Sequence, residues 1–187
     1  MRNAQPSSVP SSELACRFNL PGSTTQETPL YRREDDEFQK SDPEAWELTH
    51  ALIQDAHCYG LEEEDNAELF ASGADCTYRA PIGERAFRKA ALNPPVPWTG
   101  ELRVEGAGAG DGSAGWWRTY FHDLIENRRL ADDVLLSSVR LKTGDKRSII
   151  VGRFKLNEQD QHVISAMNAA RAWVSKQNRY QLRPRIA

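Results

Sequence analysis

Residues suited to acid–base chemistry stand in three places along the chain. His57 and Tyr59 come at the end of a predicted helix, and Asp132 and Asp133 stand together before a predicted strand. Asn168 lies in an alternating segment near the C-terminus. Histidine exchanges protons near neutral pH, and burial can shift carboxyl and phenol groups toward it. These are our candidate catalytic residues, although adjacent strand residues face opposite ways, so at most one of the two aspartates can enter a cavity.

Each of these residues also has an ordinary structural interpretation. A buried tyrosine usually bonds a backbone acceptor, and a lone helical histidine is usually a surface or satisfied core residue. Acidic pairs at a strand entry are usually solvated. Both interpretations stay open for every candidate at this stage.

A second set of side chains is predicted to contact a substrate. Trp98 and Trp117 flank a glycine-rich insertion, where aromatic side chains suit either a lid over an apolar ligand or a dimer contact. His162 shares one face with Asn168 if residues 162–176 form a strand. With these three, the predicted substrate contacts are Tyr78, Trp98, Trp117, Tyr120 and His162.

The glycine-rich insertion contains the pattern G-x-G-x-x-G at Gly110, Gly112 and Gly115. A dinucleotide site of this kind needs a βαβ unit with an acidic residue after the next parallel strand. Here the following segments are strands with short connectors, which must be antiparallel neighbours. We therefore interpret the stretch as a linker or a lid, and we predict no cofactor.

Composition excludes several classes of protein. The 187 residues carry a formal net charge of −3, which argues against nucleic-acid binding. No stretch of 18 apolar residues occurs, so no membrane span is expected, and the first residues lack the apolar core of a signal peptide. Cys16, Cys58 and Cys76 have no paired spacing, which predicts reduced thiols in a cytoplasmic protein and no metal site.

The expected elements follow from hydrophobic periodicity and turn residues. Residues 1–40 are polar and non-periodic, so they should form a disordered or partner-wrapping arm ahead of a domain at 41–187. Ser41 or Asp42 can cap a helix start with Pro43 in its first turn, Glu44 would complete a capping box with Ser41, and Gly60 fits the helix end. The expected helices are 41–59, 62–72 and 113–129, and the expected strands are 75–81, 100–106, 133–142, 147–156, 162–176 and 179–187.

The order of these elements carries a family resemblance. The entry into the first strand reads Leu69, Phe70, Gly73, Ala74, Asp75 and Tyr78. With the later paired strands and the ending around Tyr180, it resembles the nuclear transport factor 2-like superfamily, and within it the SnoaL-like polyketide cyclases and dehydratases. The resemblance covers roughly residues 44–187. It implies an α+β cone-shaped barrel, in which about three N-terminal helices pack on a strongly curved antiparallel or mixed sheet.

The chain also departs from that pattern. At the strand entry where that group often has a histidine, this chain reads "ADDVLLSSV" without one, and it has Ser138 where an asparagine is common. The usual acid–base pair therefore cannot be transferred residue by residue.

The resemblance leads us to expect a cofactor-independent enzyme, a lyase or isomerase. It would cyclise, dehydrate or isomerise a small apolar molecule of polyketide or terpenoid type, as a homodimer without nucleic-acid or membrane partners. Two alternatives remain open: a non-catalytic β subunit of an aromatic-ring-hydroxylating dioxygenase, whose cone is similar, and a binding module for small ligands without turnover.

Overall fold

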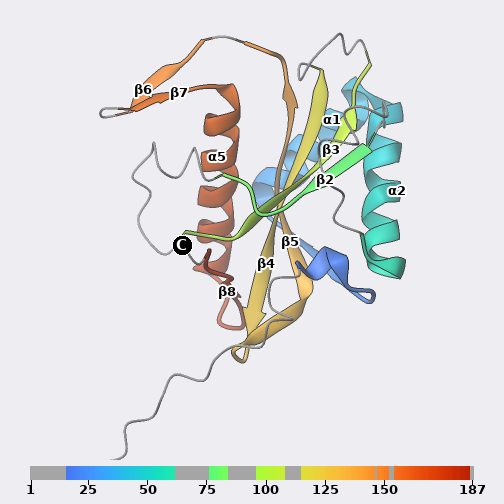
Figure 1. Ribbon diagram of the computed structural model, residues 1–187, viewed down its shortest axis with the longest axis vertical. Helices are drawn as coiled ribbons and strands as arrows, with labels where there is room; N and C mark the ends of the chain where they lie inside the picture. The colour runs from blue at the N-terminus through green and yellow to red at the C-terminus, as the bar shows by residue number, and fades with distance from the viewer. Residues whose placement is uncertain are drawn as a thin grey trace, which may run out of the picture.

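The computed structural model describes residues 16–61, 76–83, 96–107, 115–145, 147–151 and 154–185. The described residues form helices on both sides of a β-sheet (Figure 1). In chain order the elements are η2 (Arg17–Asn19), β1 (Thr24–Glu27), α1 (Pro29–Ser41), α2 (Pro43–Tyr59), β2 (Cys76–Arg79), β3 (Thr99–Glu105), β4 (Trp116–Glu126), β5 (Arg129–Lys142), β6 (Ile149–Val151), β7 (Phe154–Leu156), α5 (Glu158–Val174) and β8 (Gln181–Leu182).

One mixed sheet organises the molecule. Its strand order is β1-β5-β4-β3-β2, and β8 adds to β4. β1 runs parallel to β5, and the other pairs in this sheet are antiparallel. The predicted α+β class and the mixed sheet are confirmed. The predicted barrel is wrong for the described residues, because the end strands β1 and β2 do not pair with each other and the sheet stays open.

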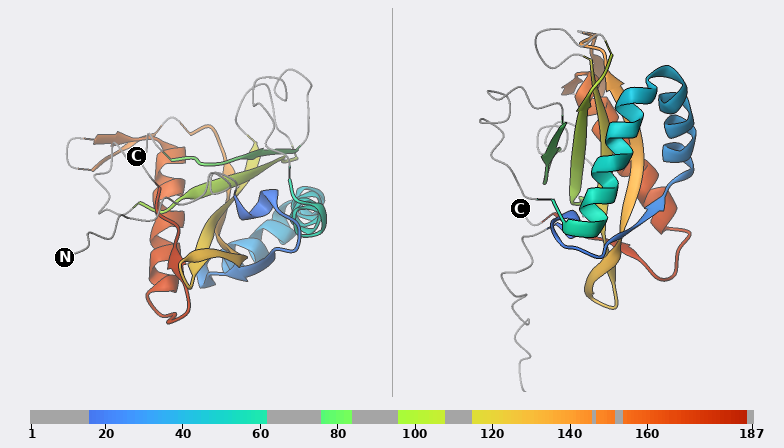
Figure 2. Two further views of the ribbon diagram at one scale, coloured as in Figure 1. Left: turned by 60° about the horizontal axis from the view of Figure 1, so that its bottom comes forward. Right: turned by 90° about the vertical axis from the view of Figure 1, so that its right-hand side faces the viewer.

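Helices cover both faces of this sheet. Figure 2 shows α1 and α2 on one face and α5 on the other, so the sheet lies between them. The prediction placed all helices ahead of the long meander, whereas α5 follows β7 near the C-terminus. None of the helices in the described ranges combines the length and the apolar character needed to cross a membrane.

Capping residues explain where the three α-helices begin. The side chain of Thr28 caps α1, and that of Asp42 caps α2, as residue types at these positions often do. The Asn157 side chain caps α5, and the Asp160 carboxylate accepts from the Asn157 backbone N–H, which completes a capping box. The helix predicted at 41–59 is confirmed as α2.

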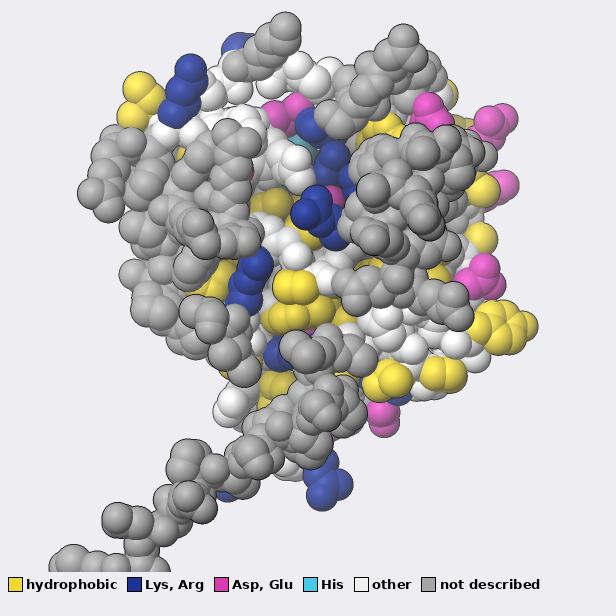
Figure 3. All heavy atoms as spheres, viewed as in Figure 1, with side chains coloured by type: hydrophobic (Ala, Val, Ile, Leu, Met, Phe, Trp, Pro, Cys, Tyr) yellow, Lys and Arg dark blue, Asp and Glu magenta, His cyan; other side chains and the backbone are white. Residues whose placement is uncertain are grey.

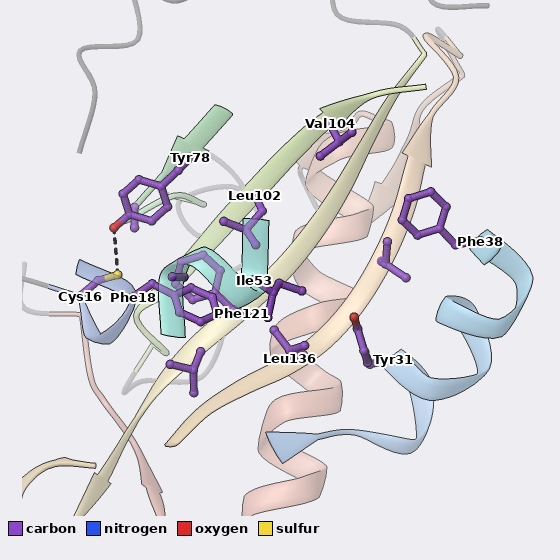
Figure 4. Close-up of a cluster of buried hydrophobic side chains, with 14 of the residues drawn as sticks. Cys16, Phe18, Tyr31, Phe38, Ile53, Tyr78, Leu102, Val104, Phe121 and Leu136 are labelled. Carbon is purple, nitrogen blue, oxygen red and sulfur yellow. Dashed lines mark hydrogen bonds between the residues drawn. The ribbon is translucent and has the colours of Figure 1, made fainter. Parts of the chain in front are cut away.

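The largest apolar core lies between the sheet and the α1–α2 side (Figure 4). Phe121 of β4 lies at its centre, with Phe18 of η2 against its ring at 4.7 Å between centroids. The buried members are Cys16, Phe18, Tyr31, Phe38, Ala45, Ile53, Ala56, Tyr78, Ala80, Trp98, Leu102, Val104, Phe121, Val134, Leu136 and Val139.

Two smaller apolar clusters lie under α5 on the opposite face. One joins Tyr120 to the α5 residues Val163, Ala166 and Met167, together with Ile82 and Val96. The other joins Leu124, Ala131, Leu135, Ala170 and Tyr180. The two faces of β4 therefore serve different helices.

The predicted strand at 162–176 is wrong, because these residues belong to helix α5. Val163, Ala166, Met167 and Ala170 are buried, and their spacing of three and four residues is helical. Small and apolar residues occupy both odd and even positions of this segment, so its sequence also fits the alternating pattern of a strand. The capping box at Asn157 is the local signal that favours the helix.

The predicted helix at 113–129 is also wrong, because residues 116–126 form strand β4. Trp117 and Phe121 face the α1–α2 side, whereas Tyr120 and Leu124 face α5. Pairs four residues apart lie on one side of a strand as well as of a helix, so the spacing did not discriminate. The aromatic and β-branched residues of this stretch favour the strand.

Residues 16–40 differ from the disordered arm that composition predicted. Tyr31 and Phe38 of α1 are buried, and β1 pairs with β5. A few large apolar side chains, each fully covered, are enough to hold this segment on the domain. Residues 1–15, the predicted helix 62–72 and the resemblance positions up to Asp75 lie outside the described residues.

Candidate functional site

The predicted catalytic residues of α2 point away from the sheet or bond locally. The Tyr59 side chain is 77% exposed, so it lies in no interior site of the described structure. His57 Nδ1 lies 2.7 Å from the Ser23 hydroxyl. Partial burial, with a contribution from the Arg17 charge, lowers the pKa of His57.

The two candidate aspartates have separate structural partners. Asp132 is exposed and forms an ion pair with Arg17 at 3.1 Å. Asp133 accepts hydrogen bonds from Thr24 Oγ1 at 2.7 Å, Gln26 Nε2 at 3.0 Å and the Tyr180 hydroxyl at 2.5 Å. Burial acts to raise the pKa of Asp133, but these hydrogen bonds outweigh it and the pKa falls. Asp133 thus ties β1 and the C-terminal segment to β5.

Asn168 lies on the exposed side of α5. The prediction gave it a cavity-facing place on a strand, and the helical backbone removes the basis for that place. Tyr59 and Asn168 thus lie on the surface of α2 and α5. His57, Asp132 and Asp133 lie around η2 and β1, where Arg17 pairs with Asp132 and its charge acts on His57, whereas Asp133 bonds Thr24. Among the described residues no hydrogen bond joins two of the five.

Three of the predicted substrate contacts belong to the large core on the α1–α2 side. The Tyr78 hydroxyl lies 2.9 Å from both Cys16 Sγ and Asn19 Oδ1 (Figure 4 draws the first of these). Trp117 stacks on Phe38 with 4.0 Å between ring centroids. The third, Trp98, is buried in the same cluster. The remaining two, Tyr120 and His162, lie on the opposite face, beside a group of charged residues.

Three arginines stand side by side on that face of the sheet. In the strand register Arg103 of β3 lies opposite Arg118 of β4, and Arg118 lies opposite Arg140 of β5. Directly opposed residues of antiparallel strands have Cβ atoms about 4.5–5.5 Å apart, and like charges there are destabilising. We call Arg103, Arg118 and Arg140 the arginine row. Folding stability alone does not favour such a row.

Two buried glutamates partly neutralise the row. Both carboxylate oxygens of Glu101 accept from Arg118 Nη1, at 3.1 and 2.9 Å, and Glu101 Oε1 lies 3.5 Å from Arg103 Nε. Glu34 of α1 forms an ion pair with Arg140. The same Glu34 carboxylate also accepts from the backbone N–H of Val139 at 3.0 Å, so it caps an open stretch of the β5 edge.

Several buried polar atoms, in the arginine row and in the neighbouring Tyr120, have no hydrogen-bond partner among the described residues. They include Arg118 Nε, Arg140 Nε and the Tyr120 hydroxyl. Tyr120 is completely buried, and Arg118 is only 3% exposed. Burial, followed by the charge of Glu101, raises the pKa of Tyr120, so its hydroxyl keeps its proton and stays a donor. Buried donors without a partner are rare, because each costs about 1–3 kcal/mol.

The rim of the row carries groups that can change charge. Burial lowers the pKa of His162 of α5; the nearby Glu158 raises it, while Arg140 and Arg118 lower it further. Burial also lowers the pKa of Lys142 of β5. Arg140 is 41% exposed, so this end of the row reaches the surface. On the face seen in Figure 3, Lys and Arg side chains gather over the upper part of the molecule, with acidic and histidine side chains beside them.

This arrangement is suited to holding an anion. The atoms Arg118 Nε, Arg140 Nε and the Tyr120 hydroxyl are donors, so a group that supplies acceptors would satisfy them. Guanidinium groups match carboxylate and phosphate oxygens, and they bind them more strongly inside a protein than in water. Within the described residues, no three His, Cys, Asp or Glu side chains gather closely enough to hold a metal ion.

Sequence reasoning missed the arginine row and both of its glutamates. The one available signal was parity, because Arg118 and Tyr120 alternate with apolar residues along one strand, as do Glu101 and Arg103 along another. Reading it required recognising residues 116–126 as a strand and knowing the strand register.

Comparison with protein-family models, curated proteins and solved structures found no match to this chain.

Proposed function

We propose that this protein binds a small organic anion at the arginine row. The observation that carries the proposal is the register of Arg103, Arg118 and Arg140, with Arg118 Nε and the Tyr120 hydroxyl buried beside it and no hydrogen-bond partner for either in the described part of the chain. A sheet that places like charges side by side and buries unsatisfied donors gives up stability. Such departures from stable packing concentrate at functional sites.

The ligand's anionic group supplies the missing acceptors. An oxygen near Arg118 Nε and the Tyr120 hydroxyl accepts from both, and Arg140 gives the group a charged route from the surface. Tyr120 also belongs to the apolar cluster with Val163 and Met167. An organic anion, with a charged end and a less polar remainder, fits a boundary of this kind.

The enzyme predicted from the sequence is our second proposal, after anion binding. Two of its predicted substrate contacts, Tyr120 and His162, lie at the row, and His162 supplies a group that can exchange protons. Its predicted catalytic residues do not converge there. Membership of the SnoaL-like group, the cone, the homodimer and the apolar substrate remain predictions.

A binding experiment with a charge-neutral variant tests the main proposal. Thermal unfolding and calorimetric titration are measured with acetate, benzoate, sulfate and phosphate, with sodium chloride added to hold the ionic strength constant. The double variant Glu101→Gln/Arg118→Gln removes the buried Glu101–Arg118 ion pair and keeps the net charge, while Arg103 loses its contact with the Glu101 carboxylate. We expect the wild type to bind at least one of these anions, and the double variant to bind it more weakly, because the lost contact with Arg118 is direct and outweighs the lost repulsion from Glu101.

A matched control uses an exposed ion pair elsewhere. Glu126 and Arg179 form two hydrogen bonds, at 2.5 and 3.0 Å, away from the row. The double variant Glu126→Gln/Arg179→Gln should bind as the wild type does. If no anion binds the wild type, or if both double variants lose binding equally, the arginine row is not the site.

A further inference from the structure

Glu101 is the negative charge that lies deepest in the arginine row. It is only 1% exposed. It lies opposite Tyr120 in the strand register, two residues along from the Arg103–Arg118 pair and on the same face of the sheet. Its carboxylate contacts both of those guanidinium groups, at 2.9–3.1 Å for Arg118 and 3.5 Å for Arg103. An anion at the unsatisfied edge of Arg118 therefore lies close to a buried carboxylate as well.

This placement determines how the site responds to ligand charge. Solvent ions screen buried charges much less than exposed ones, so salt weakens the repulsion between Glu101 and an anion at the row only slightly. The repulsion is proportional to the ligand's own charge. A doubly charged anion is therefore penalised twice as strongly, in free energy, as a singly charged one at the same place.

We infer that Glu101 is the residue that determines charge selectivity at the arginine row, and that the ligand is a singly charged organic anion of the carboxylate class. This inference rests on the proposed function. Arg118 and Arg103 attract a dianion twice as strongly as a monoanion, and Glu101 offsets part of that attraction for both. The cost of removing an ion from water rises with the square of its charge, so the reduced attraction excludes sulfate-like and phosphate-like dianions first. Glu101 thus acts by repulsion against the wrong ligands, which is a common source of specificity.

The variant Glu101→Gln tests this with acetate as the monoanion and sulfate as the dianion. Calorimetric affinities are measured at pH 7 and constant ionic strength. At a separation of about 6 Å and an effective dielectric of about 40, removing one charge should raise acetate affinity about tenfold. Sulfate carries two charges, so its gain in binding free energy is twice as large and its affinity should rise about a hundredfold.

Two control variants separate charge from structure. Glu101→Asp keeps the charge, so it should retain the wild-type preference for acetate over sulfate even if both affinities change. Glu47→Gln removes an exposed carboxylate from α2, on the other side of the sheet, and should change neither affinity. If Glu101→Gln is less stable, its unfolding temperature should rise more steeply with added sulfate than that of the wild type.

The outcomes distinguish this inference from the proposed function. If the wild type binds acetate but Glu101→Gln raises acetate and sulfate affinity equally, or lowers both, Glu101 only holds the arginines in place and the inference is wrong. The proposed function then stands. If neither protein binds either anion, both proposals fail. If only Glu101→Gln binds, the row is a structural ion-pair network in the wild type and the proposed function fails.

Discussion

Replacing Tyr120 with phenylalanine should separate stability from binding. The Tyr120 hydroxyl is buried and has no hydrogen-bond partner among the described residues. A buried hydroxyl without a partner has lost its water without compensation, which costs about 1–3 kcal/mol. Its removal leaves the ring packing against Val163 and Met167 in place. We therefore expect the free energy of unfolding to rise by about 1 kcal/mol, whereas most core substitutions lower it.

The same substitution should weaken anion binding. A hydrogen bond from a neutral donor to a charged acceptor contributes about 1.5–3 kcal/mol, so Tyr120→Phe should bind acetate at least tenfold more weakly. Stability is measured by urea unfolding without added anion, and affinity is measured by calorimetric titration. Stability should increase while anion affinity decreases, as is common where a functional site lowers the stability of the fold.

Tyr78→Phe is the matched control on the other face of the sheet. The Tyr78 hydroxyl is also buried, but it bonds Cys16 and Asn19 at 2.9 Å. Its loss leaves those groups without the phenol, so unfolding should become easier by about 1–2 kcal/mol, with anion affinity unchanged. A similar loss of stability in Tyr120→Phe would mean that the Tyr120 hydroxyl is satisfied in solution, and the reasoning would be refuted.

Three further predictions concern titration and the packing of the C-terminal segment. Because burial and nearby arginines lower the pKa of His162 and a bound anion raises it, anion affinity should increase from pH 7 to pH 5, and His162→Gln should abolish that increase in calorimetric titrations. Burial lowers the pKa of His122 to about 3, so only the unfolded chain takes up this proton as the pH falls below about 6.5. Urea unfolding at pH 7 and pH 4 should show a loss of about 3 kcal/mol from this residue, absent in His122→Gln; an equal loss in both proteins would contradict it. Asp133→Asn should lower the free energy of unfolding by about 1–2 kcal/mol at pH 7, because Asp133 accepts from Thr24, Gln26 and Tyr180; unchanged urea unfolding would count against this.

The sequence by itself determined the elements with strong local signals. The cap at Asp42, the proline that follows it and Gly60 bound α2 in sequence and in structure alike. The strand predicted at 133–142 is found as part of β5. These features depend on residues a few positions apart in the sequence, so a short window of the sequence contains all the residues involved.

Local spacing left two elements undecided. The segment of α5 and the segment of β4 both carry apolar residues at spacings that suit a helix and a strand. What decides them is burial against distant residues, such as Phe121 against Phe18 and Met167 beneath the sheet. A window of the sequence cannot contain those partners.

The arginine row depended entirely on tertiary structure. Parity along β3 and β4 assigns Arg103 and Arg118 to one face once both are known to be strands. Which residue lies opposite which is set by strand register, and register depends on how the whole sheet packs against α1, α2 and α5. The individual arginines were visible in the sequence, but their adjacency, and the buried Glu101 between them, exist only in the folded chain.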